Sequence, residues 1–429
     1  MSGKVTIARA LTAHEDGFLD LESPDRIQVV SGVAILDDAL DFDRLRERLE
    51  VVVAEKTQYR CLIAGTEERI WQIDPEFDLT RHCYRVELSD ASTNDVLTWT
   101  ANQAAQGLDA RHSPWRIILI DGVINEANGQ VGSAVAIIAH HALIDGLEGL
   151  NFYSSLLDAG HRKTTAPNEV SAKPFRDKGQ AWEKGPVVSS GCVKAMMSEM
   201  TRRAARSPLT GEGSSGRQAI SFTWSREQFN RAKHQLNASF QEVLLSILSE
   251  GLSGYCRRHG QIKNLRAILP LGRQGGKTPE FDSNRHDAGF LSMPLRASGI
   301  RQRIDRIREG LNHLKFQRDT RVFPTIINFV GCLPRRLRQR FVTLYASRAA
   351  LLISILPGGK SKQQIGGVTV RSLFAQPALP PRHAVTIGAI AMRNQVCVTV
   401  QLDPAVVKSP QDLASEFNRA FATFSTAVA

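Results

Sequence analysis

Cysteine is scarce in this sequence, with only six among 429 residues, and no two form a Cys-x-x-Cys pair. That spacing argues against a zinc site, and the scatter gives no sign of a disulfide framework. We therefore expect no metal site and reduced thiols in the core. The cysteines concerned are Cys61, Cys83, Cys192, Cys256, Cys332 and Cys397.

Long hydrophobic runs are also missing. The longest, such as Gly132–Ala139 and Ala349–Leu356, fall well short of the ~20 residues that cross a bilayer. The first residues include acids where a secretory signal would be apolar. With 42% hydrophobic and 23% charged residues, the composition is globular, and we expect a soluble, cytoplasmic protein.

Positive charge is in excess, and most of it is local. The net charge is +11, and Arg301–Arg348 contains 12 basic and 3 acidic residues, which leaves +2 for the rest of the chain. No nucleic-acid recognition motif accompanies this stretch, so we expect no nucleic-acid partner. A solvated helix face is the simplest interpretation, and the interleaved Leu337 and Phe341 favour contact with a membrane or a partner.

Hydrophobic periodicity predicts alternating strands and helices in both halves of the chain. The expected strands are Val29–Leu36, Trp115–Ile120, Val131–Ile138, Leu265–Leu271, Ala384–Met392 and Gln395–Leu402. Expected helices begin after Asp41, after the Ser239–Glu242 capping box and at Ser409-Pro410, and others cover Asn94–Gln106, Gly146–Leu157 and Ile300–Phe316. We predict two α/β sandwiches, over residues 1–157 and 219–429, joined by a crossover over 158–218 that could hold one helix in Cys192–Arg206.

The most informative segment is HHALIDG at residues 140–146, which directly follows a predicted strand. Two adjacent histidines followed at these offsets by Asp and Gly should arise by chance in roughly one chain in a thousand of this composition. A histidine held at the end of a buried strand can take a proton from an alcohol or amine that attacks a thioester, and return it to the leaving thiolate. His141 is the better candidate for this base, because strand alternation places His140 on the opposite face.

Two interpretations of Asp145 follow from its place across the turn. It could brace the loop through an ion pair with a buried arginine, since a carboxylate aimed at the reacting atoms would repel a developing oxyanion. It could also simply cap the helix that starts near Gly146, with both histidines as hydrogen-bonded core residues. The complete pattern favours catalysis.

The chain resembles the bacterial wax ester synthase/acyl-CoA:diacylglycerol acyltransferase family, within the chloramphenicol-acetyltransferase and condensation-domain superfamily. The resemblance rests on HHxxxDG, on the opening LTAHEDGFLDLESP (residues 11–24) and on a Trp…Phe-Asp-Leu…His pattern. It continues through LPLGR (269–273), Asn284-Arg285 and the closing hairpin with Asp403. The pattern residues here are Trp71, Phe77, Asp78, Leu79 and His82.

The resemblance implies two chloramphenicol-acetyltransferase-like α/β sandwich subdomains with an active-site tunnel at their interface. It implies an acyltransferase with His140, His141, Asp145 and Gly146 in the catalytic motif, and with oxyanion donors from the second half. Arg60 would pair with Asp145, and His82 would be structural. Substrate contacts would fall to Trp115, Asn284, Arg273 and Ser354, and His286 could face the tunnel.

Some positions depart from the family pattern. Pro-Leu-Trp appears as Ser113-Pro114-Trp115, with Arg116 in place of the usual acid. The family's Thr-x-Asn-Asp appears as Ser239-Phe240-Gln241-Glu242, and its Ser-Asn-Val-Pro-Gly-Pro as residues 354–359, where Ile355 replaces an amide donor. These changes leave the chemistry supported and the substrate open.

Three functions stay open on the sequence. The first is transfer of a fatty acyl group from acyl-CoA to an alcohol, with no cofactor beyond the thioester co-substrate. The second is a specialised condensation of a group bound to an acyl-carrier protein with an amine or an unusual alcohol. The third is a non-catalytic binding or scaffold protein. The basic stretch could serve coenzyme A phosphates, an acidic carrier, or peripheral contact with anionic lipid on the inner membrane surface.

Overall fold

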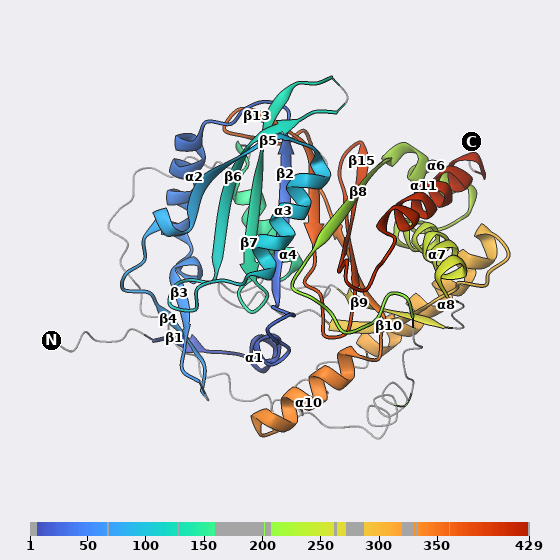
Figure 1. The fold of residues 1–429 in the computed structure, drawn as a ribbon, viewed down its shortest axis with the longest axis horizontal. Helices are drawn as coiled ribbons and strands as arrows, with labels where there is room; N and C mark the ends of the chain where they lie inside the picture. Colours follow the sequence, from blue (N-terminus) through green and yellow to red (C-terminus); the bar gives the residue numbers. More distant parts are fainter. Residues whose placement is uncertain are drawn as a thin grey trace.

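The computed structural model describes residues 7–66, 68–126, 128–158, 201, 207–260, 264–271, 287–319, 330, 333–359 and 361–427. Most of the expected crossover, including the helix within Cys192–Arg206, lies outside these ranges, so its boundaries stay a prediction. The described elements form two six-stranded sheets, each with helices packed on it, and a small three-stranded sheet (Figure 1).

The first large sheet carries the HHALIDG strand close to its centre. Its strand order is β12-β13-β2-β7-β6-β5, and neighbours are antiparallel except for the edge pair β5 and β6. The bounds are β2 Val29–Leu36, β5 Cys83–Ala91, β6 Trp115–Ile124, β7 Val131–His140, β12 Gln364–Ile365 and β13 Val368–Gln376. The predicted strands β2, β6 and β7 are confirmed, each within a few residues of its expected bounds.

Helices cover both faces of this sheet. On one face α2 (Phe42–Glu55) and α4 (Gly146–Leu156) share an apolar cluster with Ile117 and Leu119 of β6. On the other face α3 (Thr93–Ala105) packs on Ile118 and Ile120, as the alternation of side chains along β6 requires. Asp41 caps α2 by accepting hydrogen bonds from two backbone N–H groups, as predicted.

The second large sheet has the order β10-β9-β11-β14-β15-β8. Its strands are β8 Gln218–Ser225, β9 Leu265–Leu271, β10 Asp287–Met293, β11 Leu351–Pro357, β14 Val385–Ala391 and β15 Gln395–Leu402. Its helices are α6 Arg226–Gln235, α7 Phe240–His259, α8 Ile300–Asp319 and α11 Pro410–Ala427. The capping box that starts α7 is confirmed, with Ser239 and Glu242 each bonded to the other's backbone N–H.

One feature of the sheets was not predicted. Residues 364–376 belong to the C-terminal part of the sequence, yet β12 and β13 extend the N-terminal sheet beside β2. The register places Phe374 opposite Val33. The C-terminal half therefore contributes a strand pair to the N-terminal sheet. The helix α3 lies between the two sheets, because it also packs on β8 (Figure 1).

The N-terminal segment lies below the first large sheet in the view of Figure 1. A small sheet joins β1 (Ile7–Ala10), which precedes α1 (Ala13–Asp20), to β4 (Ile70–Ile73) and β3 (Cys61–Ala64), which follow α2. The helix α10 (Arg335–Ala346) packs against α1 (Figure 1). The buried Arg26 fastens the segment to the far end of the chain, because its Nη2 lies 3.0 Å from Oδ2 of the buried Asp403.

The structure bears on two expectations from the sequence, one about the cysteines and one about membrane-spanning helices. Four of the six cysteines lie in the described part of the chain, and each is a buried free thiol, as predicted; Cys192 and Cys332 lie outside it. Among the described helices, none is both long and apolar enough to cross a bilayer.

Candidate active site

The HHALIDG segment forms a tight turn from β7 into α4. The strand ends at His140, and backbone N–H groups of Leu143 and Ile144 donate back to the carbonyl oxygen of His140 at 2.9 and 3.2 Å. The N–H of His141 donates to the carbonyl oxygen of Gln28 at 2.8 Å, which ties the turn to the segment after α1. Because the strand stops at His140, the alternation rule does not extend to His141.

His140 is buried, and both of its ring nitrogens are engaged. Its Nδ1 accepts a hydrogen bond from the N–H of Ala142 at 3.0 Å, so in the neutral ring the proton belongs on Nε2. That Nε2 lies 3.1 Å from Oε1 of Glu22 and can donate to it. His140 therefore positions the turn, and its nitrogens are not available to a substrate.

Glu22 is a site residue that the sequence did not reveal. Its Oε1 also accepts from the N–H of Gln28 at 2.9 Å. Burial acts to raise the pKa of Glu22, but the hydrogen bond and charge of His140 and the Gln28 N–H outweigh it, so the pKa lies below its ordinary value. Glu22 is thus a carboxylate at neutral pH. The only signal for it was its place in the LTAHEDGFLDLESP opening.

His141, the predicted base, is half-buried between two buried neighbours. Its ring stacks on Phe18 of α1, with centroids 3.8 Å apart and planes at 9°. His14 meets the same Phe18 edge-on, with centroids 5.2 Å apart. The stacked phenyl ring fixes the orientation of the imidazole plane, so the N-terminal segment contacts both histidines of the motif.

Asp145 is the N-cap of α4, the second of the two interpretations considered for it. Its Oδ1 accepts from the N–H of Glu148 at 2.8 Å. Burial raises the pKa of Asp145 to about 6, and the charge of Glu148 adds to this, against the lowering effect of two backbone hydrogen bonds. The predicted ion pair with Arg60 is not formed: Arg60 ends the 3-10 helix η1 (Thr57–Arg60), and no hydrogen bond or salt bridge joins these two described residues.

Gly146 allows the second half of the chain to approach the motif. A Cβ at this position would lie 2.9 Å from Cδ2 of Leu356, so a larger residue would force that side chain to move. Leu356 belongs to β11, and strand alternation puts Ser354 on the same face of β11 as Leu356. Ser354 is half-buried there, which leaves its predicted substrate contact a prediction.

Two other predicted residues belong to the core. Trp115 is completely buried, and its Nε1 donates to the carbonyl oxygen of Tyr59 at 2.7 Å. Its predicted substrate contact is therefore wrong, because no face of the indole is exposed. His82 is structural, as expected: its Nδ1 lies 2.8 Å from the carbonyl oxygen of Trp115, and burial lowers its pKa. Arg273, Asn284 and His286 lie outside the described residues.

Two sequence models of one acyltransferase family match the chain. The catalytic domain of wax ester synthase/diacylglycerol acyltransferase matches residues 11–242. The C-terminal domain of the same family matches residues 283–424. Together these matches cover well over half of the sequence, including the HHALIDG turn.

Individual relatives are distant in sequence but similar in length. A Mycobacterium tuberculosis protein named as a diacylglycerol O-acyltransferase is 21% identical, over 94% of this chain and 93% of its own. The O-acyltransferase WSD of Acinetobacter baylyi is 22% identical, over 76% of this chain and 78% of its own.

Solved structures share the fold across the whole chain. The wax ester synthase/diacylglycerol acyltransferase of Marinobacter aquaeolei has a TM-score of 0.68 at 16% identity, and the match covers 98% of this chain and 99% of that one. The first condensation domain of the calcium-dependent antibiotic synthetase has a TM-score of 0.68 at 15% identity, covering 99% and 97%. The predicted fold class is thereby confirmed, and at these identities the likeness concerns the fold alone.

Proposed function

The chain belongs to the wax ester synthase/diacylglycerol acyltransferase family and is an O-acyltransferase, and from this we propose that it transfers a fatty acyl group from acyl-CoA to an alcohol. The product is an ester of the wax or triacylglycerol type. His141 is the general base, and acyl-CoA is a co-substrate, with no further cofactor in the reaction.

The reaction takes place in a complex of protein, thioester and alcohol. A ring nitrogen of His141 accepts the proton of the alcohol as its oxygen attacks the thioester carbonyl carbon. The tetrahedral intermediate then collapses, the C–S bond breaks, and the imidazolium returns its proton to the departing sulfur. One ester and one free thiol are formed, and no acyl group is attached to the protein.

The observation that carries this proposal is the contrast between the two histidines. His140 is buried with both nitrogens engaged by Ala142 and Glu22, whereas His141 is only half-buried and its ring plane is held by Phe18. A base needs a fixed orientation and access to substrate, and of the two only His141 combines them.

The charge distribution around the turn suits an oxyanion intermediate. A carboxylate aimed at the reacting carbonyl would oppose the developing negative charge. Asp145 instead directs Oδ1 at the first turn of α4, and Glu148 accepts hydrogen bonds from the Tyr59 hydroxyl and the Gln58 amide at 2.8 and 2.9 Å. Both acids are thus occupied by structural partners.

The test is release of free thiol from long-chain acyl-CoA by the full chain, with a panel of alcohols and amines. We expect release that depends on an alcohol, and a rate about 10²-fold or more lower in His141→Ala at unchanged thermal stability. The exposed His234→Ala serves as the matched control and should retain the wild-type rate.

The same panel separates the competing functions. Release that depends on an amine, or that requires a carrier-bound thioester, would replace fatty-ester synthesis by condensation chemistry at the same base. An undiminished rate in His141→Ala would contradict the role of His141.

A further inference from the structure

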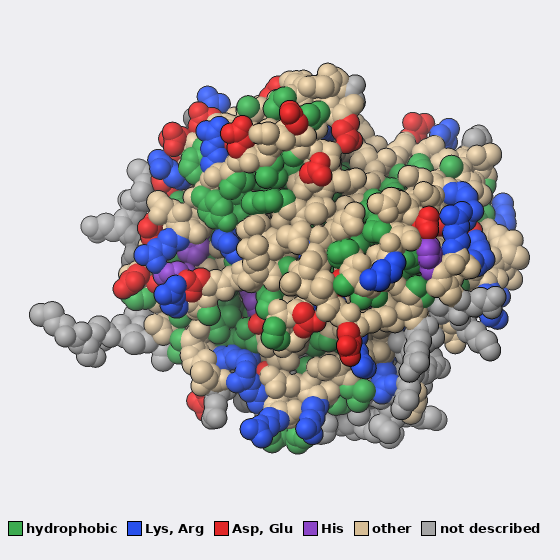
Figure 2. Space-filling model, in the orientation of Figure 1, with side chains coloured by type: hydrophobic (Ala, Val, Ile, Leu, Met, Phe, Trp, Pro, Cys, Tyr) green, Lys and Arg blue, Asp and Glu red, His purple; other side chains and the backbone are tan. Residues whose placement is uncertain are grey.

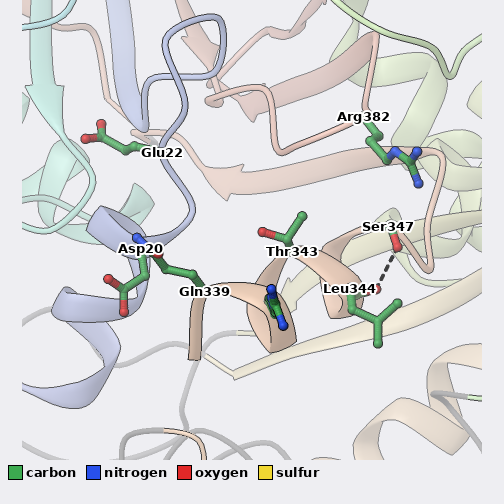
Figure 3. Close-up of a pocket in the computed structure, with 8 residues that line it drawn as sticks. Asp20, Glu22, Gln339, Thr343, Leu344, Ser347 and Arg382 are labelled. Carbon is green, nitrogen blue, oxygen red and sulfur yellow. Dashed lines mark hydrogen bonds between the residues drawn. The ribbon is translucent and has the colours of Figure 1, made fainter. Parts of the chain in front are cut away.

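A pocket of about 510 Å³ lies where the two halves of the chain meet beneath the sheets. Asp20 and Glu22 of the N-terminal segment form one side of it (Figure 3). Thr343 and Leu344 of α10 form a second side, and Arg382 projects from the opposite rim (Figure 3). Arg340 of the same helix also lines the pocket.

Basic side chains dominate the surroundings of the pocket. Figure 2 shows Lys and Arg side chains gathered over the lower edge of the molecule, where α10 lies in Figure 1. Part of this charge is structural, because Arg338 pairs with Asp20 and lies 2.7 Å from Asp16, and Arg335 lies 3.6 Å from Asp20. These pairs hold α10 against α1 and compensate the acids.

Two arginines remain for a ligand. Within the described part of the chain, the guanidinium groups of Arg340 and Arg382 have no hydrogen bond and no salt bridge, and both residues are exposed. Arg69, Arg335 and Arg338 pair with Asp16 and Asp20, whereas Glu22 keeps its charge because its partner His140 is neutral. With Arg340 and Arg382, five arginines thus face three acids in and beside the pocket, and this net positive charge suits a phosphate.

Arg382 is held in a costly backbone conformation. Its φ is +67°, in the left-handed region that non-glycine residues rarely adopt. The next residue, His383, is completely buried, and its Nε2 lies 3.0 Å from the carbonyl oxygen of Ala346 at the end of α10. This anchor fixes the arginine at the rim on the side opposite Glu22.

The pocket also borders the catalytic turn. Glu22 lines the pocket and contacts His140, whose neighbour in the chain is His141. A ligand whose charged end lies between the two arginines can therefore extend toward the proposed base. A long, flexible thiol arm with phosphates at one end has this form.

We propose that this pocket binds the phosphate groups of acyl-CoA, with Arg340 and Arg382 as their partners. The inference rests on the proposed function and adds the side from which the donor enters. The pantetheine arm then runs past Glu22 and delivers the thioester to His141.

The test compares binding of coenzyme A with binding of pantetheine, which has the thiol arm but no phosphate, by titration calorimetry of the full chain. Arg340→Gln and Arg382→Gln should each weaken coenzyme A binding roughly tenfold and leave pantetheine binding unchanged. Wild-type affinity for coenzyme A should fall with added salt, and this dependence should flatten in the double variant. Arg336→Gln, an exposed change on α10 outside the pocket lining, is the matched control and should bind like wild type.

Equal affinity of the wild type for the two probes would overturn the inference, as would unchanged coenzyme A binding in the double variant or an equal loss for both probes. Thiol release distinguishes a failure here from a failure of the proposed function. If the wild type is active but its coenzyme A binding does not depend on the two arginines, only the inference about the pocket fails. If the wild type is inactive, or His141→Ala is active, the proposed reaction itself fails.

Discussion

The two large sheets have the same number of strands but differ in what lies at their ends. In the N-terminal sheet, β7 ends in a turn rich in buried polar groups, where His140, Asp145 and Glu148 each have fixed partners. The C-terminal sheet is covered by a mainly apolar cluster of α7 and α11 with the strands beneath them. Among the described residues, the catalytic candidates lie in the N-terminal half, while the C-terminal half supplies apolar packing and the two arginines of the proposed phosphate site.

The C-terminal half contacts the N-terminal half through a few residues that are distant in the sequence. The C-terminal half contributes β13 to the N-terminal sheet, Asp403 to Arg26, and Arg338 to Asp16 and Asp20 of α1. Changes at these contacts should therefore mainly affect stability, whereas changes at His141 and at Glu22 should mainly affect rate.

The largest effect is expected at the anchor between the halves. Asp403→Ala leaves Arg26 buried without its closest acid, and removal of one partner of a buried pair should lower the free energy of unfolding by about 3–5 kcal/mol. Asp25→Ala is the matched control, because Asp25 lies 3.8 Å from Arg26 but its side chain is 43% exposed, and it should cost below about 1 kcal/mol. Urea denaturation measures the free energy of unfolding of both variants. Equal losses of stability would contradict the role of the Arg26–Asp403 pair as an anchor.

Acid should weaken the same half through His383. Burial lowers the pKa of His383 to about 4, well below the 6.5 of an exposed imidazole. The unfolded chain thus binds the proton first, so stability is complete above pH 6.5 and falls as the pH drops toward 4. The slope should be at most about 1.4 kcal/mol per pH unit. Denaturation midpoints at pH 7 and 5 should differ less in His383→Gln than in wild type or the exposed His234→Gln; equal differences in all three would exclude His383 as the cause.

A smaller effect, and one on rate, is expected at Glu22. Glu22→Ala removes the acceptor of the His140 Nε2–H bond and should lower the rate of acyl transfer roughly tenfold, while Glu22→Gln retains an acceptor oxygen and much of the rate. The pKa of Glu22 in the folded protein lies below its ordinary value of 4.5, so Glu22 stays ionised above pH 4.5 and is protonated only at lower pH. Rates between pH 5 and 8 should therefore show no titration of Glu22. The exposed Glu47→Ala on α2 is the control. A wild-type rate in Glu22→Ala would show that the turn does not need this contact.

The smallest effect is expected at the cap of α4. Asp145→Ala removes the acceptor for the Glu148 N–H and should lower the free energy of unfolding by about 1 kcal/mol. Asp145→Asn should retain most of this stability, because asparagine caps a helix as well as aspartate does. Thermal unfolding of the three proteins provides the measurement. If the alanine and asparagine variants were equally destabilised, the carboxylate would have a role other than capping.

Local signals in the sequence predicted local structure well. The apolar runs of β2, β7 and β15, the Ser239 capping box and the HHALIDG turn all depend on residues close together in the chain, and each is confirmed. The family resemblance extended this to the fold class, because its motifs are spread over both halves.

Contacts between distant residues were not predictable in the same way. Glu22 meets His140 across 118 positions, and β13 joins β2 although it follows four strands of the other sheet. Arg60 was assigned to Asp145 by similarity alone, but Asp145 accepts from a backbone N–H of α4, and no hydrogen bond or salt bridge joins it to Arg60, although the structure describes both residues. No local pattern separates such partners from other buried polar residues.

The most direct test of the central claim is the initial-rate pattern with acyl-CoA and alcohol both varied. Attack of the alcohol on the thioester in one complex with His141 as base predicts double-reciprocal lines that intersect. Parallel lines, together with an added acyl mass on the protein in the absence of alcohol, would indicate a covalent acyl-enzyme and contradict the account.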